Sequence, residues 1–240
     1  RLERNMDIKD FYREVDGIYA NEDWDAAEEL FNAAMTETAG DEEMHAVVQN
    51  EMGVCFMKRG MHLEAIDALS NAAAYFASAH GPASNEVVSI KTNLARVYSA
   101  MAEHQKAREI LMELCDLLGE EPSPLLYDAC VGIGHESRLL SDFETAITYL
   151  ERAKQVALAY GQGEPLIACL FDLGAVQFER GYRGEAVNAL SEAVDLCRQQ
   201  GILDTEFGQG VQAFYDEMNK SACCGCSSSL AQDPITIENE

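Results

Sequence analysis

The chain has 240 residues, of which 48% are hydrophobic and 25% are charged, as is typical of a folded globular protein. Its 17 Lys and Arg residues stand against 42 Asp and Glu residues, so the net charge is −25. Such an acidic chain repels phosphate backbones and anionic lipid, which argues against nucleic acid as a partner. No apolar run reaches the roughly 18–20 residues of a membrane span.

The segment 1–6 contains no apolar stretch of the kind found in secretory signal peptides, so we expect a cytoplasmic protein. Met6 leaves two alternatives open for this segment. It is either an N-terminal extension of the protein, or a few added residues ahead of a natural start at Met6.

The composition favours helix, because Ala, Leu and Glu are abundant, Pro is scarce at 5, and apolar residues recur at helical spacing. We therefore predict an all-α protein whose first ten helices form five antiparallel pairs. Their expected spans in chain order are 7–20 with 23–37, 42–59 with 62–79, 83–102 with 104–119, 123–140 with 142–160, and 164–180 with 182–200.

An eleventh helix is expected at about 204–220, because its apolar residues share one face. These residues are Phe207, Val211, Phe214 and Met218. A stacked array leaves its last apolar face uncovered, so a capping role is expected for this helix. A docking stripe for another protein is the alternative.

The five pairs are copies of one unit. Each second helix carries an alanine at the corresponding position: Ala27, Ala65, Ala107, Ala146 and Ala186. Small residues in the first helices are expected to let the two helices of a pair pack closely; they are Gly53, Ala95, Gly134 and Gly174. Gly60 and Gly181 fall where first helices end, where glycine accepts the left-handed conformation. Ser141 and Glu144 match a capping box that begins a second helix.

One stretch carries a clear resemblance: His80-Gly81-Pro82, then Thr92-Asn93-Leu94-Ala95-Arg96-Val97-Tyr98. It resembles the tetratricopeptide repeat (TPR) family. The resemblance covers about residues 8–200, and the long units, near 40 residues rather than 34, are similar to the repeats of kinesin light chain. It implies a right-handed α-solenoid of five TPR-like helix-turn-helix repeats with a C-terminal capping helix, spanning 7–220. A flexible, acidic Cys/Ser-rich tail is expected at 221–240.

The sequence offers little catalytic chemistry. It contains no phosphate-cradling glycine loop, no His-Glu-x-x-His motif and no Gly-x-Ser-x-Gly motif. His62 and His104 fall at the starts of second helices, where we expect contact with solvent. Acidic runs such as Asp41-Glu42-Glu43 begin helices, where they complement the helix dipole. We therefore expect no enzyme and no cofactor.

The cysteines form two groups. Five fall singly within expected helices, where each is predicted to be a small, buried, reduced residue; they are Cys55, Cys115, Cys130, Cys169 and Cys197. Cys223, Cys224 and Cys226 lie close together after the last helix. Three alternatives stay open for them: incidental cysteines in a tail, a redox or metal site that lacks the fourth ligand of a closed zinc site, or modified thiols.

The resemblance implies that partner contacts come mainly from the first helices, on the concave side of the array. The partner-binding candidates on that side are Tyr12, Asn50, Lys58, Asn93, Arg96, His135, Arg138 and Phe171. Asn50 and Asn93 are suited to bind a peptide backbone, and the basic residues favour an acidic or carboxylate-bearing partner. The alternative is that these Lys and Arg residues are ordinary surface residues.

The resemblance does not extend to chaperone-tail binding. Family members with that function use a Lys–Asn–Asn–Lys–Arg clamp, and the matching positions hold Tyr12, Asp16, Val54, Arg96 and Ala100. The sequence thus predicts a non-enzymatic scaffold or adaptor that binds a protein or peptide. Two alternatives are a peptide-sensing regulatory protein and an enzyme accessory protein whose Cys tail carries metal or sulfur. Formation of a homo-oligomer also stays open.

Overall fold

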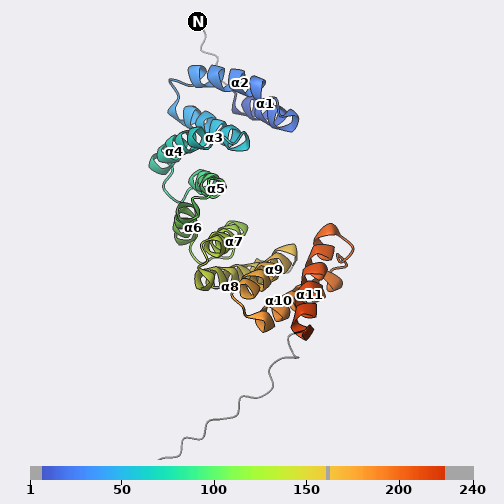
Figure 1. Cartoon of the computed structure of the whole chain (residues 1–240). Coiled ribbons are helices and arrows are strands. Elements are labelled where there is room, and N and C mark those ends of the chain that lie inside the picture. Colours follow the sequence, from blue (N-terminus) through green and yellow to red (C-terminus); the bar gives the residue numbers. More distant parts are fainter. Residues whose placement is uncertain (1–6, 161–162, 225–240) are drawn as a thin grey trace, which may run out of the picture. The chain divides into compact units, whose positions relative to one another are not determined.

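The computed structural model describes residues 7–160 and 163–224, which form eleven helices joined by short turns, with no strand among them (Figure 1). The first helices of the five pairs are α1 (Ile8–Asn21), α3 (Glu42–Lys58), α5 (Asn85–Ala100), α7 (Pro124–Leu139) and α9 (Glu164–Glu179). The second helices are α2 (Trp24–Glu37), α4 (His62–Ala79), α6 (His104–Leu118), α8 (Phe143–Tyr160) and α10 (Arg183–Gln199). The last helix is α11 (Glu206–Cys224).

The predicted all-α class and the five helix pairs are confirmed. Every predicted boundary of α1–α10 lies within two residues of the observed one. Helix α11 begins at Glu206 and ends at Cys224, rather than at about 204 and 220. Cys223 and Cys224 therefore belong to its last turn, while Cys226 lies outside the described residues. Of the helices in the described part of the chain, none combines the length and apolar character that crossing a membrane requires.

Several helices begin where a short polar side chain accepts a hydrogen bond from a free backbone N–H group. The residues that do so at α1, α2, α3, α5 and α7 are Asp7, Asp23, Asp41, Ser84 and Ser123. The capping box predicted at Ser141 and Glu144 is wrong. Asp142 accepts instead, from the amide N–H of Thr145 at 3.2 Å, because Ser141 is part of the preceding turn.

One residue between the two helices of every pair has a left-handed backbone. The five residues, with their φ angles, are Glu22 (53°), Gly60 (73°), Ala102 (58°), Ser141 (59°) and Gly181 (91°). The conformation predicted at Gly60 and Gly181 is thus confirmed. The other three pairs make the same turn with a side chain present, although only glycine adopts this conformation without a steric cost.

Glycines of three first helices pack directly on leucines of their second helices. A Cβ atom at Gly53 would lie 2.5 Å from Leu69 Cγ, whereas carbon atoms in contact are normally about 3.5–4.0 Å apart. The same contact recurs in the pairs Gly134–Leu150 and Gly174–Leu190. The glycines predicted in α3, α7 and α9 therefore do allow the two helices of these pairs to approach closely.

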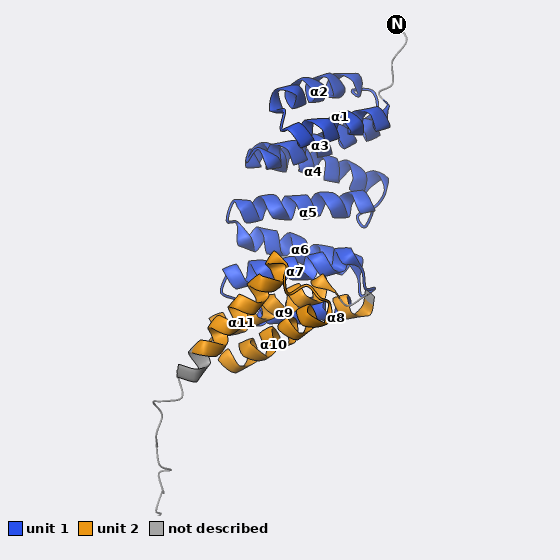
Figure 2. Ribbon diagram, turned by 90° about the vertical axis from the view of Figure 1, so that its right-hand side faces the viewer, with its two compact units in different colours: residues 1–156 blue, residues 157–240 orange. Residues whose placement is uncertain are grey.

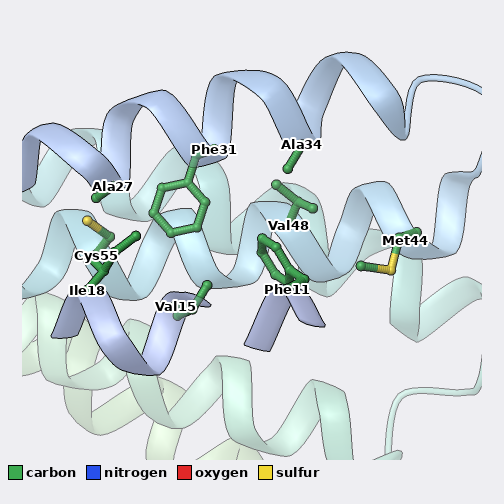
Figure 3. Packing of buried hydrophobic residues seen from close by; sticks show 9 residues of the cluster. All are labelled: Phe11, Val15, Ile18, Ala27, Phe31, Ala34, Met44, Val48 and Cys55. Carbon is green, nitrogen blue, oxygen red and sulfur yellow. The ribbon is translucent and has the colours of Figure 1, made fainter. Parts of the chain in front are cut away.

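The chain divides into two compact units, residues 1–156 and 157–240 (Figure 2). Within unit 1, the helix pairs α1–α2, α3–α4 and α5–α6, and then α7, follow one another in chain order (Figure 2). Figure 3 shows the core of its first three helices, which consists of Phe11, Val15, Ile18, Ala27, Phe31, Ala34, Met44, Val48 and Cys55. The rings of Phe11 and Phe31 meet edge to face, with centroids 6.3 Å apart.

Unit 2 contains α9, α10 and α11. Val211 and Met218 of α11 are buried, and the ring centroid of Phe214 lies 5.1 Å from that of Phe171 on α9. Three of the four apolar residues predicted on one face of this helix therefore pack against the last pair, while Phe207 is 39% exposed. The predicted capping role of α11 is confirmed.

Candidate functional site

The first helices of unit 1 border two pockets. The N-terminal pocket has a volume of about 460 Å³ and lies between α1, α3 and α5. Its polar wall consists of Tyr12, Glu43, Asn50, Glu51, Asn85, Glu86 and Ser89. Its apolar wall consists of Ile8, Val47, Phe76 and Ile90. Residues far apart in the sequence thus meet here because three successive first helices lie next to one another.

The central pocket, of about 540 Å³, lies between α5 and α7. Its polar wall consists of Thr92, Arg96, Ser99, Asp128 and Glu136. Leu111 of α6 also lines it, next to Gly132 of α7. A Cβ atom at Gly132 would lie 2.8 Å from Leu111 Cδ1, so the glycine leaves room for this leucine. Both pockets share α5, which contributes Glu86 to the first and Arg96 to the second.

Negative charge dominates the N-terminal pocket, where Glu43, Glu51 and Glu86 all line the wall. Burial raises the pKa of Glu51, and a hydrogen bond from Asn50 Nδ2 to Glu51 Oε1, at 3.0 Å, partly opposes this shift. Burial also raises the pKa of Tyr12, and the charges of Glu51 and Glu86 raise it further. The pocket therefore disfavours any additional negative charge.

Tyr19 fixes the α1–α3 contact beside this pocket. Its hydroxyl donates a hydrogen bond to the backbone oxygen of Glu51 at 2.9 Å. Burial raises the pKa of Tyr19, so the hydroxyl keeps the proton that it donates. Lys58 Nζ lies 5.1 Å from the centroid of the Tyr19 ring, in a cation–π contact. Lys58 is thus in contact with an aromatic ring, and it lines neither pocket.

Two carboxylates at the central part of unit 1 have side-chain partners on α6. His104 Nδ1 lies 2.7 Å from Glu136 Oε2, and Arg108 Nη1 lies 2.8 Å from Asp142 Oδ2. The Glu136 side chain is only 5% exposed, and that of His104 is 23% exposed. The expectation that His104 mainly contacts solvent is therefore wrong. The pair joins residues 32 positions apart, so helical spacing carried no signal of it.

The structure brings some of the predicted partner-binding residues together. Tyr12 and Asn50 line the N-terminal pocket, and Arg96 lines the central pocket. The remaining candidates of unit 1 line neither pocket. Apart from Lys58, these are the half-buried Asn93 and Arg138 and the exposed His135.

The last predicted residue, Phe171, belongs to unit 2. With Phe207 and Val211 of α11 it lines a pocket of about 540 Å³. Its ring contacts Phe214, so the capping helix covers part of the aromatic surface that the sequence assigned to a partner.

Sequence reasoning missed Glu43, Glu86 and Glu136 as pocket residues. Glu43 and Glu86 lie in the first turns of α3 and α5, where carboxylates are explained by the helix dipole alone. A signal for Glu43 did exist. It precedes Val47 by four residues and Asn50 by seven, which places all three on one face of a helix.

The metal and thiol chemistry of the described residues is limited. Among the side chains that the structure describes, in 7–159 and 163–220, no group of three or more His, Cys, Asp and Glu residues gathers as a metal site would require. The five helical cysteines are buried and unbridged, as predicted. Cys115 Sγ and Cys130 Sγ lie only 3.7 Å apart. Their hydrogen bond, together with burial, raises the pKa of Cys115, so this thiol stays protonated.

Comparisons with known proteins place this fold. Residues 45–120 match the family model described as tetratricopeptide repeat. None of the curated protein sequences matches the chain significantly. Similar solved structures include BtubC (BKLC) from P. vanneervenii, with 16% identity over 97% of this chain and 87% of that one, and a TM-score of 0.71.

Two further structures have the same fold. A kinesin light chain-type protein of P. anserina, with nearly identical TPR-like repeats, has 18% identity over 80% of this chain and 94% of that one, with a TM-score of 0.66. A Rap protein complexed with competence and sporulation factor has 14% identity over 88% of this chain and 63% of that one, with a TM-score of 0.58. The resemblance to TPR proteins of the kinesin light chain type is therefore confirmed, because residues 45–120 match the tetratricopeptide repeat model and the fold matches that of the kinesin light chain-type protein.

Proposed function

We propose that this chain is a non-enzymatic scaffold that holds a peptide, or a segment of a partner protein, along the first helices of unit 1. The observation that carries this proposal is the pair of neighbouring pockets, each lined by successive first helices. Both pockets combine apolar walls with a few polar groups from different helices, a composition typical of binding sites. A segment that lies across α5 would reach both.

The polar groups of the pockets favour recognition over chemistry. Asn50 is hydrogen-bonded to Glu51, and Glu136 is paired with His104. Such contacts hold the side chains in fixed positions and so reduce the entropy that is lost when a partner binds.

A second candidate function has one supporting observation. The similar Rap protein was solved in complex with competence and sporulation factor. This neighbour favours a regulatory protein that senses a small signalling peptide, in which the bound peptide would alter the arrangement of the repeats. Cytoplasmic location and self-association stay predictions from the sequence.

Arg96 gives the central pocket a preference for a carboxylate group of the partner. Its guanidinium group is exposed and can bind a carboxylate through two parallel hydrogen bonds. Asp128 and Glu136 line the same pocket, and the net charge of −25 repels an acidic partner at long range. Binding of a partner carboxylate at Arg96 therefore depends on close pairing rather than on long-range attraction.

The test begins with random peptides displayed on phage and selected against the full chain. Recovered peptides are titrated by calorimetry against the wild type, Arg96→Ala, Asn50→Ala and Arg198→Ala. Arg198 is the matched control, because it is an exposed arginine paired with Asp195 on α10. We expect Arg96→Ala to lower the affinity by about 1–3 kcal/mol, as for a lost charge-assisted hydrogen bond, and Arg198→Ala to leave it unchanged. Peptides whose affinity changes with neither Arg96→Ala nor Asn50→Ala would bind elsewhere and refute the proposal.

A further inference from the structure

The N-terminal pocket has three carboxylates in its wall and no Lys, Arg or His among the described residues that line it. Glu43 and Glu51 come from α3, and Glu86 comes from α5. Outside the wall, His80 lies between two of them, with its Nε2 3.8 Å from Glu43 Oε1 and its Nδ1 3.7 Å from Glu86 Oε1. An uncharged imidazole leaves the negative charge of the pocket in place.

One buried acceptor of a pocket residue lacks a hydrogen-bond donor. Asn50 Nδ2 donates to Glu51 Oε1 at 3.0 Å, but Asn50 Oδ1 is buried and has no donor within the described structure. A buried acceptor without a donor costs free energy, and such atoms are rare in folded proteins. A bound group that carries N–H donors would satisfy this oxygen.

The pKa shifts of Tyr12 and Glu51 also indicate that the pocket favours a positive charge. The charges of Glu51 and Glu86 raise the pKa of Tyr12 beyond the effect of burial. Burial raises the pKa of Glu51, so this carboxylate lies in a poorly solvated position. A positive charge in the pocket would stabilise both ionised carboxylates.

The apolar wall fits the remainder of such a group. Ile8, Val47, Phe76 and Ile90 can cover an aliphatic stem, and Tyr12 in the same lining carries an aromatic ring that can attract a cation. The volume of about 460 Å³ lies within the usual range of about 300–1,000 Å³ for ligand pockets.

We propose that the N-terminal pocket binds an arginine or lysine side chain of an extended partner segment, with Glu51 and Glu86 pairing with its positive charge. This inference rests on the proposed function. It also sets the orientation of the bound segment, because the partner's carboxylate would lie at Arg96 in the central pocket and its basic side chain in the N-terminal pocket. Glu86 and Arg96 are ten residues apart on α5, which is about 15 Å along a helix. An extended chain covers that distance in about four or five residues, so the partner's basic and acidic positions are at least that far apart.

The test uses a synthetic peptide, acetyl-Ser-Arg-Ser-Ala-Ser-Ala-Glu-Ser-amide, and its counterpart with citrulline in place of arginine. Citrulline keeps the shape of arginine and removes its charge. Both peptides are titrated into the ¹⁵N-labelled full chain at pH 8, where histidine is uncharged. The readouts are the side-chain amide signal of Asn50 and the backbone amide signals of Ser89 and, in the central pocket, Ser99.

We expect the arginine peptide to shift the Asn50 and Ser89 signals to saturation, and the citrulline peptide to bind at least fivefold more weakly. Glu51→Gln and Glu86→Gln should each weaken the arginine peptide at least threefold. Glu28→Gln, an exposed position on α2 outside the pocket, is the matched control and should have no effect. Added salt should weaken binding, because it screens the pairing.

Four results would overturn the inference. Equal affinity for the two peptides would show that charge plays no part. If the peptide shifts the Ser99 signal but not the Asn50 signal, the cation site is refuted while the proposed binding along the first helices still stands. If neither pocket shows shifts, and the display peptides are also insensitive to Arg96→Ala, both the cation site and the proposed function are refuted. Spermidine binding as tightly as the peptide would show a site for small polycations rather than for a polypeptide.

Discussion

Replacing Gly53 by alanine tests how closely the helices of a pair must approach. The added Cβ atom would lie 2.5 Å from Leu69 Cγ and 3.2 Å from the Leu69 backbone nitrogen. Cγ is the branch point of leucine, so a rotation at the end of the side chain does not remove the clash. Either Leu69 leaves its rotamer, or α3 and α4 move apart.

The magnitude follows from two opposing effects. Forcing one extra carbon into a packed core costs about 1–3 kcal/mol. Alanine in place of glycine inside a helix gains about 0.8–1.0 kcal/mol. Gly53→Ala should therefore lower the free energy of unfolding by roughly 0–2 kcal/mol. Gly17 is the matched control, because it lies inside α1 with nothing within 4 Å of an added Cβ. Gly17→Ala should raise the free energy of unfolding by the helix-propensity gain alone.

The assay is unfolding in urea, followed by circular dichroism and by the fluorescence of Trp24, the single tryptophan, which packs against the core of α1–α3. Repeat proteins can unfold in steps, so both signals are needed. In a Leu69→Ala background the Cβ at position 53 would occupy vacated space, and Gly53→Ala should then become neutral or stabilising. If Gly53→Ala stabilises the wild type as much as Gly17→Ala does, the close-approach argument is refuted.

Three other changes have defined outcomes. Ala102→Gly should raise the free energy of unfolding by about 0.5–1 kcal/mol, seen as a higher urea midpoint, because Ala102 has a φ of 58° and glycine removes the steric cost there. Burial raises the pKa of Glu51 above 4.5, so its contribution to stability is present below that pH and is lost as the pH rises through the raised pKa. Glu51→Gln should therefore raise the urea midpoint at pH 7 but not at pH 4, and an equal effect at both would contradict this reasoning. Met218→Ala should lower the melting temperature through a loss of about 2–5 kcal/mol, because Met218 is 4% exposed between α11 and the last pair; an unchanged melting curve would show that α11 does not cap the array.

The sequence predicted the helices well because the fold repeats. Each alanine and glycine at a repeated position reports a packing constraint that recurs in every pair, so five copies support one assignment. The capping box predicted at Ser141 was wrong for a local reason. Ser141 and Glu144 have the spacing of a capping box, but Ser141 is the left-handed residue of the turn, and the next residue, Asp142, caps the helix instead.

The site was less predictable. Tyr12, Asn50 and Arg96 were found from their positions on first helices, but the carboxylates Glu43, Glu86 and Glu136 that line the same pockets were not. The charge of the N-terminal pocket depends on Glu43 and Glu86, which belong to different helices and look like ordinary helix-start carboxylates. The His104–Glu136 contact depends on how α6 packs against α7, which a pattern within one helix does not report.

Most tertiary contacts in this chain join helices that follow one another directly, such as α3 with α4, α6 with α7, and α9 with α10. Chains dominated by such local contacts fold quickly, because little loop entropy is lost before each contact forms. A helix pair can therefore find its partner surface as soon as the next helix has been synthesised. During translation this limits the time for which the core residues of α1–α3 remain exposed to other chains.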